Sequence, residues 1–277
     1  MKILTNSGLP VKLTDDNKLN INGLAGGDFS KRVLSDLKDV ITNTSQVSPG
    51  SREEGLNDRD LYYMYRNLHK VEHDTIIREN HLRYDMTVIL PGQIGKEYTK
   101  TLGHYHPDKN GTNLSYPEVY EVISGRAFYL LQKPKRLENG IIDYSVIENV
   151  LLVEVNAGEK AIMPSDYGHI TINIDPEPLV MSNWVSNDFQ SDYSEYKNLN
   201  GGAYYLLKDD NTYQTKKNSR YLSIADIKIV KPHQLPEFGL VFGRPMYDTV
   251  INNFSVAEYL NYPYEYKDKL YPDSIYK

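Results

Sequence analysis

Two short stretches of the sequence carry the residues best suited to chemistry. The first holds His104 and His106, and side chains two apart on a strand point the same way. A turn-rich segment then leads to Glu118, which reaches the same point if the flanking strands pair as a hairpin. The second stretch reads as strand, turn and strand, and places His169 at a strand start. Three histidines and a glutamate suit a first-row divalent ion, so we predict a metal site here.

The segment before these histidines reads as a strand with two different faces. By alternation Glu97, Thr99 and Thr101 share one face, and we predict that Lys96 and Lys100 lie on a solvated face. The four other histidines show no comparable arrangement, and we interpret them as ordinary surface or hydrogen-bonding residues: His69, His73, His81 and His233.

The elements that must position these residues are strands. Residues 61–208 contain short apolar runs separated by Gly, Pro, Asn or Asp, which is typical of an all-β barrel or sandwich. Residues 1–60 form a polar N-terminal segment, with a short helix predicted near residues 29–40. We expect residues 209–277 to be a C-terminal extension packed on the barrel or on a partner subunit.

Composition excludes several classes of function. The net charge of −6 argues against a nucleic-acid surface, which needs clustered positive charge. The sequence has no cysteine, so thiolate metal sites and cysteine nucleophiles are excluded. We find no apolar stretch long enough to be a leader or a membrane span, and we therefore expect a cytoplasmic protein without a membrane partner.

Residues 91–106 have the pattern P-G-x-x-G-K-E-x-x-K-T-x-G-H-x-H, and this pattern resembles the cupin-type glucose-6-phosphate isomerases first described in archaea. The resemblance spans roughly residues 31–208. It implies a cupin-type β-barrel of jelly-roll form, a homodimer, a sugar-phosphate substrate and a step of glycolysis and gluconeogenesis. It also implies a divalent cofactor, with Fe²⁺ favoured and Mn²⁺, Zn²⁺ or Ni²⁺ as alternatives.

The same resemblance assigns individual residues. The metal ligands would be His104, His106, Glu118 and His169. The substrate's phosphate would be bound by hydroxyl groups and a backbone amide, on Tyr62, Thr87, Thr101, Gly103 and Tyr120.

Three features depart from the family pattern. Eleven residues separate His106 from Glu118, which predicts a larger loop over the site. Asp166 stands where the second motif expects glycine. Relatives carry a Tyr and a His where we align Val185 and Ser191, so we expect Tyr193 or the C-terminal extension to rebuild that wall.

Aldose–ketose isomerisation moves a proton between C1 and C2, and it requires a base above the carbon and support for the oxygens. Glu118 is our candidate base, with a hydride shift as the alternative. Other functions remain open at this point: mannose 6-phosphate isomerisation, dioxygenation, decarboxylation, or a non-catalytic cupin that binds a metal or a sugar.

Overall fold

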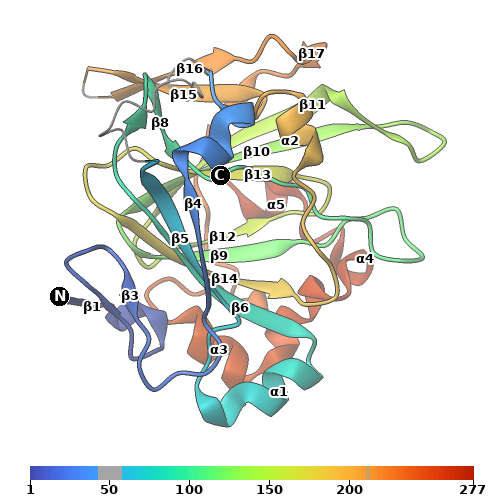
Figure 1. The fold of residues 1–277 in the computed structure, drawn as a ribbon. Coiled ribbons are helices and arrows are strands. Elements are labelled where there is room, and N and C mark those ends of the chain that lie inside the picture. The colour runs from blue at the N-terminus through green and yellow to red at the C-terminus, as the bar shows by residue number, and fades with distance from the viewer. Residues whose placement is uncertain (43–57, 211) are drawn as a thin grey trace.

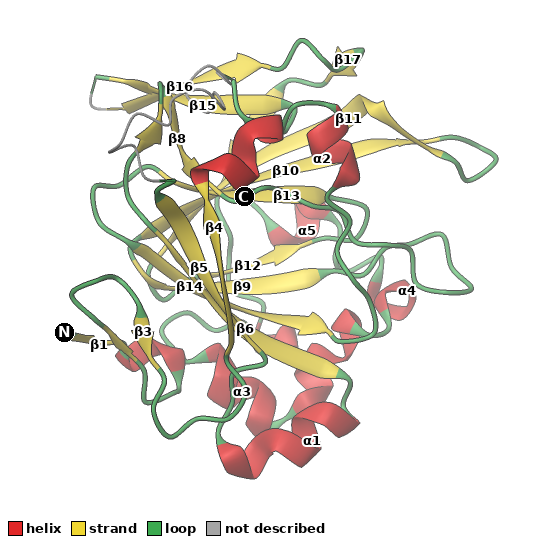
Figure 2. Cartoon of the chain, viewed as in Figure 1, coloured by secondary structure: helices red, strands yellow, loops and turns green. Residues whose placement is uncertain are grey.

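The computed structural model describes residues 1–42, 58–210 and 212–277. In these residues two β-sheets face each other and form the barrel, as Figures 1 and 2 show. The first sheet has the order β12 (Lys160–Met163), β9 (Glu118–Ser124), β14 (Leu179–Ser186), β6 (Leu82–Ile89), β5 (Asp60–Arg66) and β4 (Asp28–Val33). The all-β barrel fold expected from the sequence is therefore confirmed.

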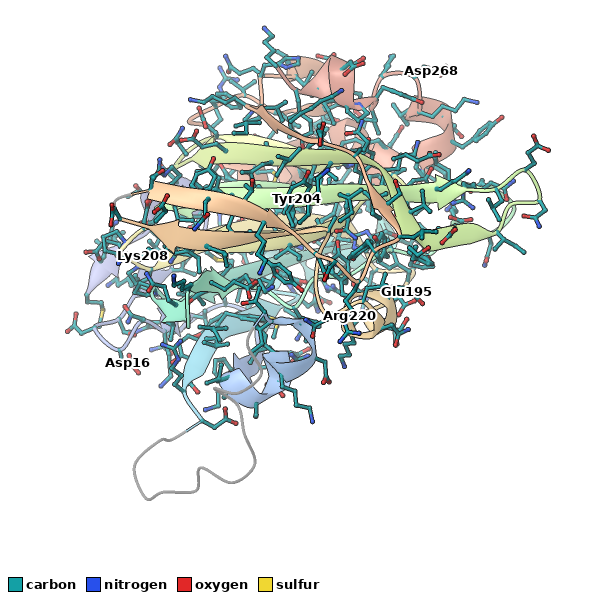
Figure 3. The ribbon with its side chains drawn as sticks, turned by 90° about the horizontal axis from the view of Figure 1, so that it is seen from above. Asp16, Glu195, Tyr204, Lys208, Arg220 and Asp268 are labelled. Carbon is teal, nitrogen blue, oxygen red and sulfur yellow. The ribbon has the colours of Figure 1, made fainter. Side chains whose placement is uncertain are left out.

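The second sheet completes the barrel and includes strands beyond residue 208. Its order is β16 (Thr212–Lys217), β15 (Tyr204–Asp209), β8 (Glu97–Lys100), β13 (Gly168–Asn173), β10 (Arg126–Arg136), β11 (Ile142–Asn156) and β17 (Ser223–Ile224). Two further strands join it, β7 (Gln93–Ile94) beside β8 and β18 (Ile227–Val230) beside β11. Figure 3 looks onto this sheet, with Tyr204 marking the first residue of β15 and Lys208 the residue before its last.

The N-terminal part adds a small sheet and an edge strand. Strands β1 (Lys2–Ile3), β2 (Lys12–Leu13) and β3 (Leu19–Asn20) pair with one another. The helix predicted near residues 29–40 is only partly present, because residues 28–33 form β4 and pair with β5. The rest is the 3₁₀ helix η2 (Leu34–Val40), whose apolar residues recur every three positions, as a 3₁₀ helix requires.

The helical part of the C-terminal extension covers the outside of the first sheet. Its helical elements are η5 (Pro236–Phe238), α3 (Met246–Asn252), η6 (Phe254–Leu260), α4 (Pro263–Tyr266) and α5 (Pro272–Ile275). On α3 the ring of Tyr247 lies 5.8 Å from Trp184 and 5.0 Å from Tyr84, both on the outward face of the sheet. This cover explains why every residue of β14 is buried.

A buried ion pair joins the extension to the sheet. Lys160 Nζ lies 2.8 Å from Glu121 Oε1, and both side chains are almost fully buried. Glu121 also accepts the backbone N–H of Met246, and Lys160 donates to the carbonyl of Val241. The division of the chain at residues 60 and 208 stays a prediction.

Two short helical elements, η4 (Val71–His73) and α1 (Asp74–Glu79), connect β5 to β6, and α2 (Ser194–Asn198) precedes β15. Among the helices of the described residues, none has the length and apolar character that a bilayer crossing requires.

Candidate active site

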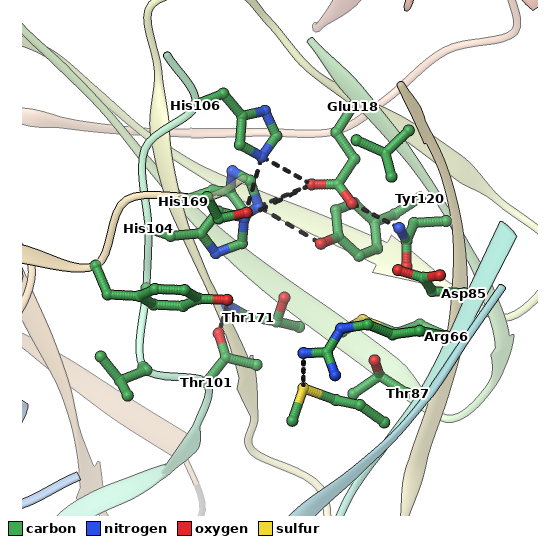
Figure 4. Close-up of a pocket in the computed structure, with 18 of the residues that line it drawn as sticks. Arg66, Asp85, Thr87, Thr101, His104, His106, Glu118, Tyr120, His169 and Thr171 are labelled. Carbon is green, nitrogen blue, oxygen red and sulfur yellow. Dashed lines mark hydrogen bonds and ion pairs between the residues drawn. The ribbon is translucent and has the colours of Figure 1, made fainter. Parts of the chain in front are cut away.

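A cavity of about 280 Å³ opens between the two sheets of the barrel. The strands of the first sheet contribute alternate residues to its wall, as the pleat of a sheet requires. Figure 4 shows these side chains converging on one space. The inward-facing residues of that sheet are Tyr62, Met64 and Arg66 on β5, Arg83, Asp85 and Thr87 on β6, Glu118 and Tyr120 on β9, and Met181, Asn183 and Val185 on β14.

The three histidines and the glutamate predicted to bind a metal lie together at one end of this cavity. Ligand atoms of His104, His106, Glu118 and His169 all lie within 4.8 Å of one another. Backbone hydrogen bonds join His104 to His169 in both directions and so bring the two motifs side by side. Glu118 reaches the histidines from the first sheet.

Hydrogen bonds outside the cluster orient two of its members. His106 Nδ1 lies 2.8 Å from the carbonyl of Tyr116, so Nδ1 carries the proton and Nε2 presents a lone pair to the centre. Asn183 donates to Glu118 Oε1 at 2.6 Å. The other oxygen, Oε2, is turned toward the histidine Nε2 atoms and has no hydrogen-bond partner among the described residues.

The electrostatics of the cluster suit a cation. Burial lowers the pKa of His104 to about 4 and that of His106 to about 3, so both imidazoles are neutral at neutral pH. Burial alone would raise the pKa of Glu118, but the neighbouring imidazoles of His104 and His169 outweigh it and hold that pKa below its usual range. A buried carboxylate oxygen facing imidazole lone pairs lacks a positive partner, and a divalent ion fits this donor set.

The residues that the resemblance assigns to the phosphate line the same cavity. Thr101 Oγ1 accepts the N–H of Thr171, and Tyr62 accepts the N–H of Leu102, so both hydroxyl hydrogens are free to point elsewhere. Thr87 lies on the wall of the first sheet. Tyr120 stands closer to the metal cluster, with its hydroxyl 3.4 Å from His169 Nε2.

Gly103 is required by the fold as well as by any ligand. It has φ +84°, and a Cβ there would lie 2.7 Å from Ile170 and 2.8 Å from Tyr196. A larger residue would therefore push apart the loop that carries His104.

The three departures from the family pattern all lie at this end of the barrel. The loop between His106 and Glu118 is tied down by Arg136, which donates to both Asp108 and Asp166. Asp166 itself has φ +67°, a conformation in which glycine is the usual residue. Val185, Ser191 and Tyr193 all line the cavity, and the ring of Tyr193 lies 5.4 Å from that of His104.

One prediction from strand alternation is wrong. Lys100 is 2% exposed, forms an ion pair with Glu97 and donates to the carbonyl of Val40. The face that we expected to be solvated is covered there by the end of η2 and by β15, since the Lys100 ammonium also lies 5.2 Å from the ring of Tyr205. Lys96, by contrast, is exposed.

Sequence reasoning missed several polar residues of the cavity, among them Arg66 and Asn183. Alternation from Tyr62 along β5 would have placed Arg66 on the inward face. Asn183 offered no comparable signal, because its role depends on the pairing of β14 with β9.

Two facing sheets with an inward cluster of three histidines and a glutamate define the molecule as a cupin. The match to a family model narrows this class. The model described as glucose-6-phosphate isomerase matches residues 31–223, and the chain belongs to that family. Its membership makes the protein an isomerase.

Individual relatives agree with the family. The glucose-6-phosphate isomerase of Thermococcus kodakarensis is 25% identical over 208 residues, covering 74% of this chain and 94% of the relative. That of Thermococcus gammatolerans is 29% identical over 166 residues, covering 60% and 74%. Among solved structures, oxalate decarboxylase from Bacillus subtilis overlaps 47% of this chain and 27% of its own at 18% identity, with a TM-score of 0.30.

Proposed function

We propose that the protein interconverts glucose 6-phosphate and fructose 6-phosphate, using a divalent metal ion bound by His104, His106, Glu118 and His169. One observation carries the proposal: the four side chains meet in the cavity of a chain from the glucose-6-phosphate isomerase family. When bound, the ion would polarise or position the C1 and C2 oxygens of the sugar. The resemblance favours Fe²⁺.

The chain's own groups account for the proton transfer in this proposal. Glu118 faces the cavity and is ionised at neutral pH, because the neighbouring imidazoles of His104 and His169 lower its pKa against the effect of burial. It would take the proton from C1 of fructose 6-phosphate and return it to C2. Asn183 holds Oε1 of this carboxylate in place. The hydroxyl groups of Thr87 and Thr101 would bind the phosphate at a distance from the reacting carbons.

The test is an isomerase assay on purified protein with its metal content measured. We expect fructose 6-phosphate to yield glucose 6-phosphate, loss of activity on chelation, and recovery with Fe²⁺ or another divalent ion. A metal-loaded protein that forms mannose 6-phosphate but no glucose 6-phosphate from fructose 6-phosphate, or that consumes oxygen instead, would overturn the substrate assignment.

We also propose that the enzyme is a cytoplasmic homodimer that serves glycolysis and gluconeogenesis, as the family resemblance implies. Sedimentation equilibrium measures the oligomeric state directly, and a monomer at micromolar concentration would contradict the dimer.

A further inference from the structure

Arg66 is a cationic group of the cavity that the family resemblance does not supply. It is the last residue of β5 and shares the inward face with Tyr62 and Met64. Figure 4 shows its guanidinium group directed into the cavity near Thr87, on the far side of the space from His106. The cavity therefore has a metal-binding end and a second, positively charged end.

The guanidinium of Arg66 makes only neutral contacts. Nη1 donates to Ser30 Oγ at 2.7 Å, and Nη2 approaches Met64 Sδ at 3.2 Å. No carboxylate of the described residues forms an ion pair with it. Arg83, the other arginine of the wall, is different, because its Nε donates to both oxygens of Asp85 at 2.9 and 3.0 Å.

The groups around Arg66 add further hydrogen-bond donors. The Thr101 hydroxyl already accepts a backbone N–H, so its own hydrogen can point into the cavity, and the same holds for Tyr62. A guanidinium with unused N–H groups beside free hydroxyl donors is matched by an anion with several acceptor oxygens. A partly buried cation also gains most from a partner of opposite charge.

We propose that Arg66 binds the phosphate group of the substrate, forming hydrogen bonds from its guanidinium to the phosphate oxygens beside the hydroxyls of Thr87 and Thr101. The identity of the sugar rests on the proposed function, whereas anion binding at Arg66 stands on the contacts above. Holding the phosphate at this end keeps its oxygens away from the metal ligands, so the C1 and C2 end of the sugar faces Glu118.

The test compares Arg66→Gln with Arg66→Lys and with Arg78→Gln, a control that removes the same charge from an exposed helix outside the cavity. Calorimetry measures the binding of inorganic phosphate, and steady-state kinetics measure fructose 6-phosphate. Arg66→Gln should weaken phosphate binding at least tenfold and raise KM at least tenfold, with a smaller change in kcat and an unchanged melting temperature. Arg66→Lys should recover part of the affinity, and Arg78→Gln should match the wild type.

Phosphate affinity in Arg66→Gln within twofold of the wild type would overturn the proposal. If the wild type binds phosphate through Arg66 yet does not isomerise fructose 6-phosphate, the anion site stands and the substrate assignment falls. The two proposals therefore fail in different experiments.

Discussion

Two buried glutamates on β9, three residues apart, occupy opposite faces of the same strand and have opposite chemistry. Glu118 faces the cavity, where the neighbouring imidazoles hold its pKa below the usual range against the effect of burial. Glu121 faces the C-terminal extension, where burial raises its pKa to about 7 despite the ion pair with Lys160.

The comparison shows that burial alone does not decide what a carboxylate does. The carboxylate of Glu118 lies beside imidazole nitrogens that can bind a cation, and one of its oxygens has no hydrogen-bond partner in the described parts of the chain. The carboxylate of Glu121 forms an ion pair with Lys160 on the neighbouring strand and accepts the backbone N–H of Met246. It therefore ties the extension to the sheet. The inner face of β9 is thus suited to catalysis, and the outer face to attaching the extension.

The largest effect should come from removing the inner charge. Glu118→Gln keeps the shape and one ligand oxygen but removes the basicity, so we expect turnover to fall about a hundredfold to ten-thousandfold. Activity and bound metal are measured on the same sample, with Glu148→Gln on the exposed face of β11 as the control.

The joint readout separates the two roles of Glu118. Loss of turnover with metal retained assigns it to the chemistry, whereas parallel loss of both assigns it to metal binding alone. Full activity in this variant would remove Glu118 from the mechanism.

Removing the outer cation should affect stability instead of turnover. Lys160→Met leaves Glu121 buried without its partner, and breaking a buried pair on one side typically costs about 3–5 kcal/mol in the free energy of unfolding. Replacing both residues, in Lys160→Met with Glu121→Leu, should recover most of this loss. Urea unfolding measures the cost, with Lys228→Met on exposed β18 as the control. Loss of activity in a Lys160→Met protein that is still folded would contradict the assignment of stability to the outer face of β9 and catalysis to the inner face.

A smaller change in rate should follow from Asn183→Ala. This substitution frees Glu118 Oε1 without touching a proposed metal ligand, and losing such an orienting hydrogen bond costs about 10–100-fold in activity or metal affinity. Asn187→Ala, just beyond β14 and exposed, serves as the matched control. Wild-type kinetics and metal binding in Asn183→Ala would show that the carboxylate is oriented without this amide.

The smallest expected effect is a pH dependence that belongs to Glu121. Its pKa is raised from the ordinary value of 4.5 to about 7, mainly by burial and further by Asp248, while Lys160 and the N–H of Met246 oppose the rise. A raised pKa means that the stabilising contribution is complete below about pH 4.5 and is lost as the pH rises to about 7. The difference in unfolding free energy between wild type and Glu121→Gln should therefore move against the wild type across this window. A difference independent of pH would contradict the shifted pKa.

The convergence of the inner face could be anticipated only in part from the sequence. The spacing of His104 and His106 predicts that they point the same way, but the expected hairpin with Glu118 is wrong, because His104 bridges His169 in the second sheet and Glu118 reaches them from the first. The outer face could not be anticipated. Glu121 and Lys160 are far apart in the sequence, and Met246 belongs to a region without strong periodicity. Only the pairing of β9 with β12 brings the two charges together.

Lys100 and Arg66 show the two limits of alternation. For Lys100 the assignment to a face did not reveal that η2 and β15 cover that face. For Arg66, alternation in the sequence places the side chain on the inward face. Its suitability for binding an anion depends on its contacts, which are neutral ones with Ser30 and Met64. Neither the burial of Lys100 nor the contacts of Arg66 can be predicted from periodicity, because both depend on segments distant in the chain.

The loop between His106 and Glu118 has a consequence for redesign of this enzyme. Its base is fixed at both ends, by the bridge between Asp108 and Ser115 and by the contact of Arg136 with Asp108. The carbonyl that orients His106 belongs to Tyr116, outside the bridged stretch. Residues 109–114 are therefore a graft point, where an inserted peptide would lie beside Tyr262 and Tyr264 of the C-terminal extension while the anchoring residues keep the histidine in place.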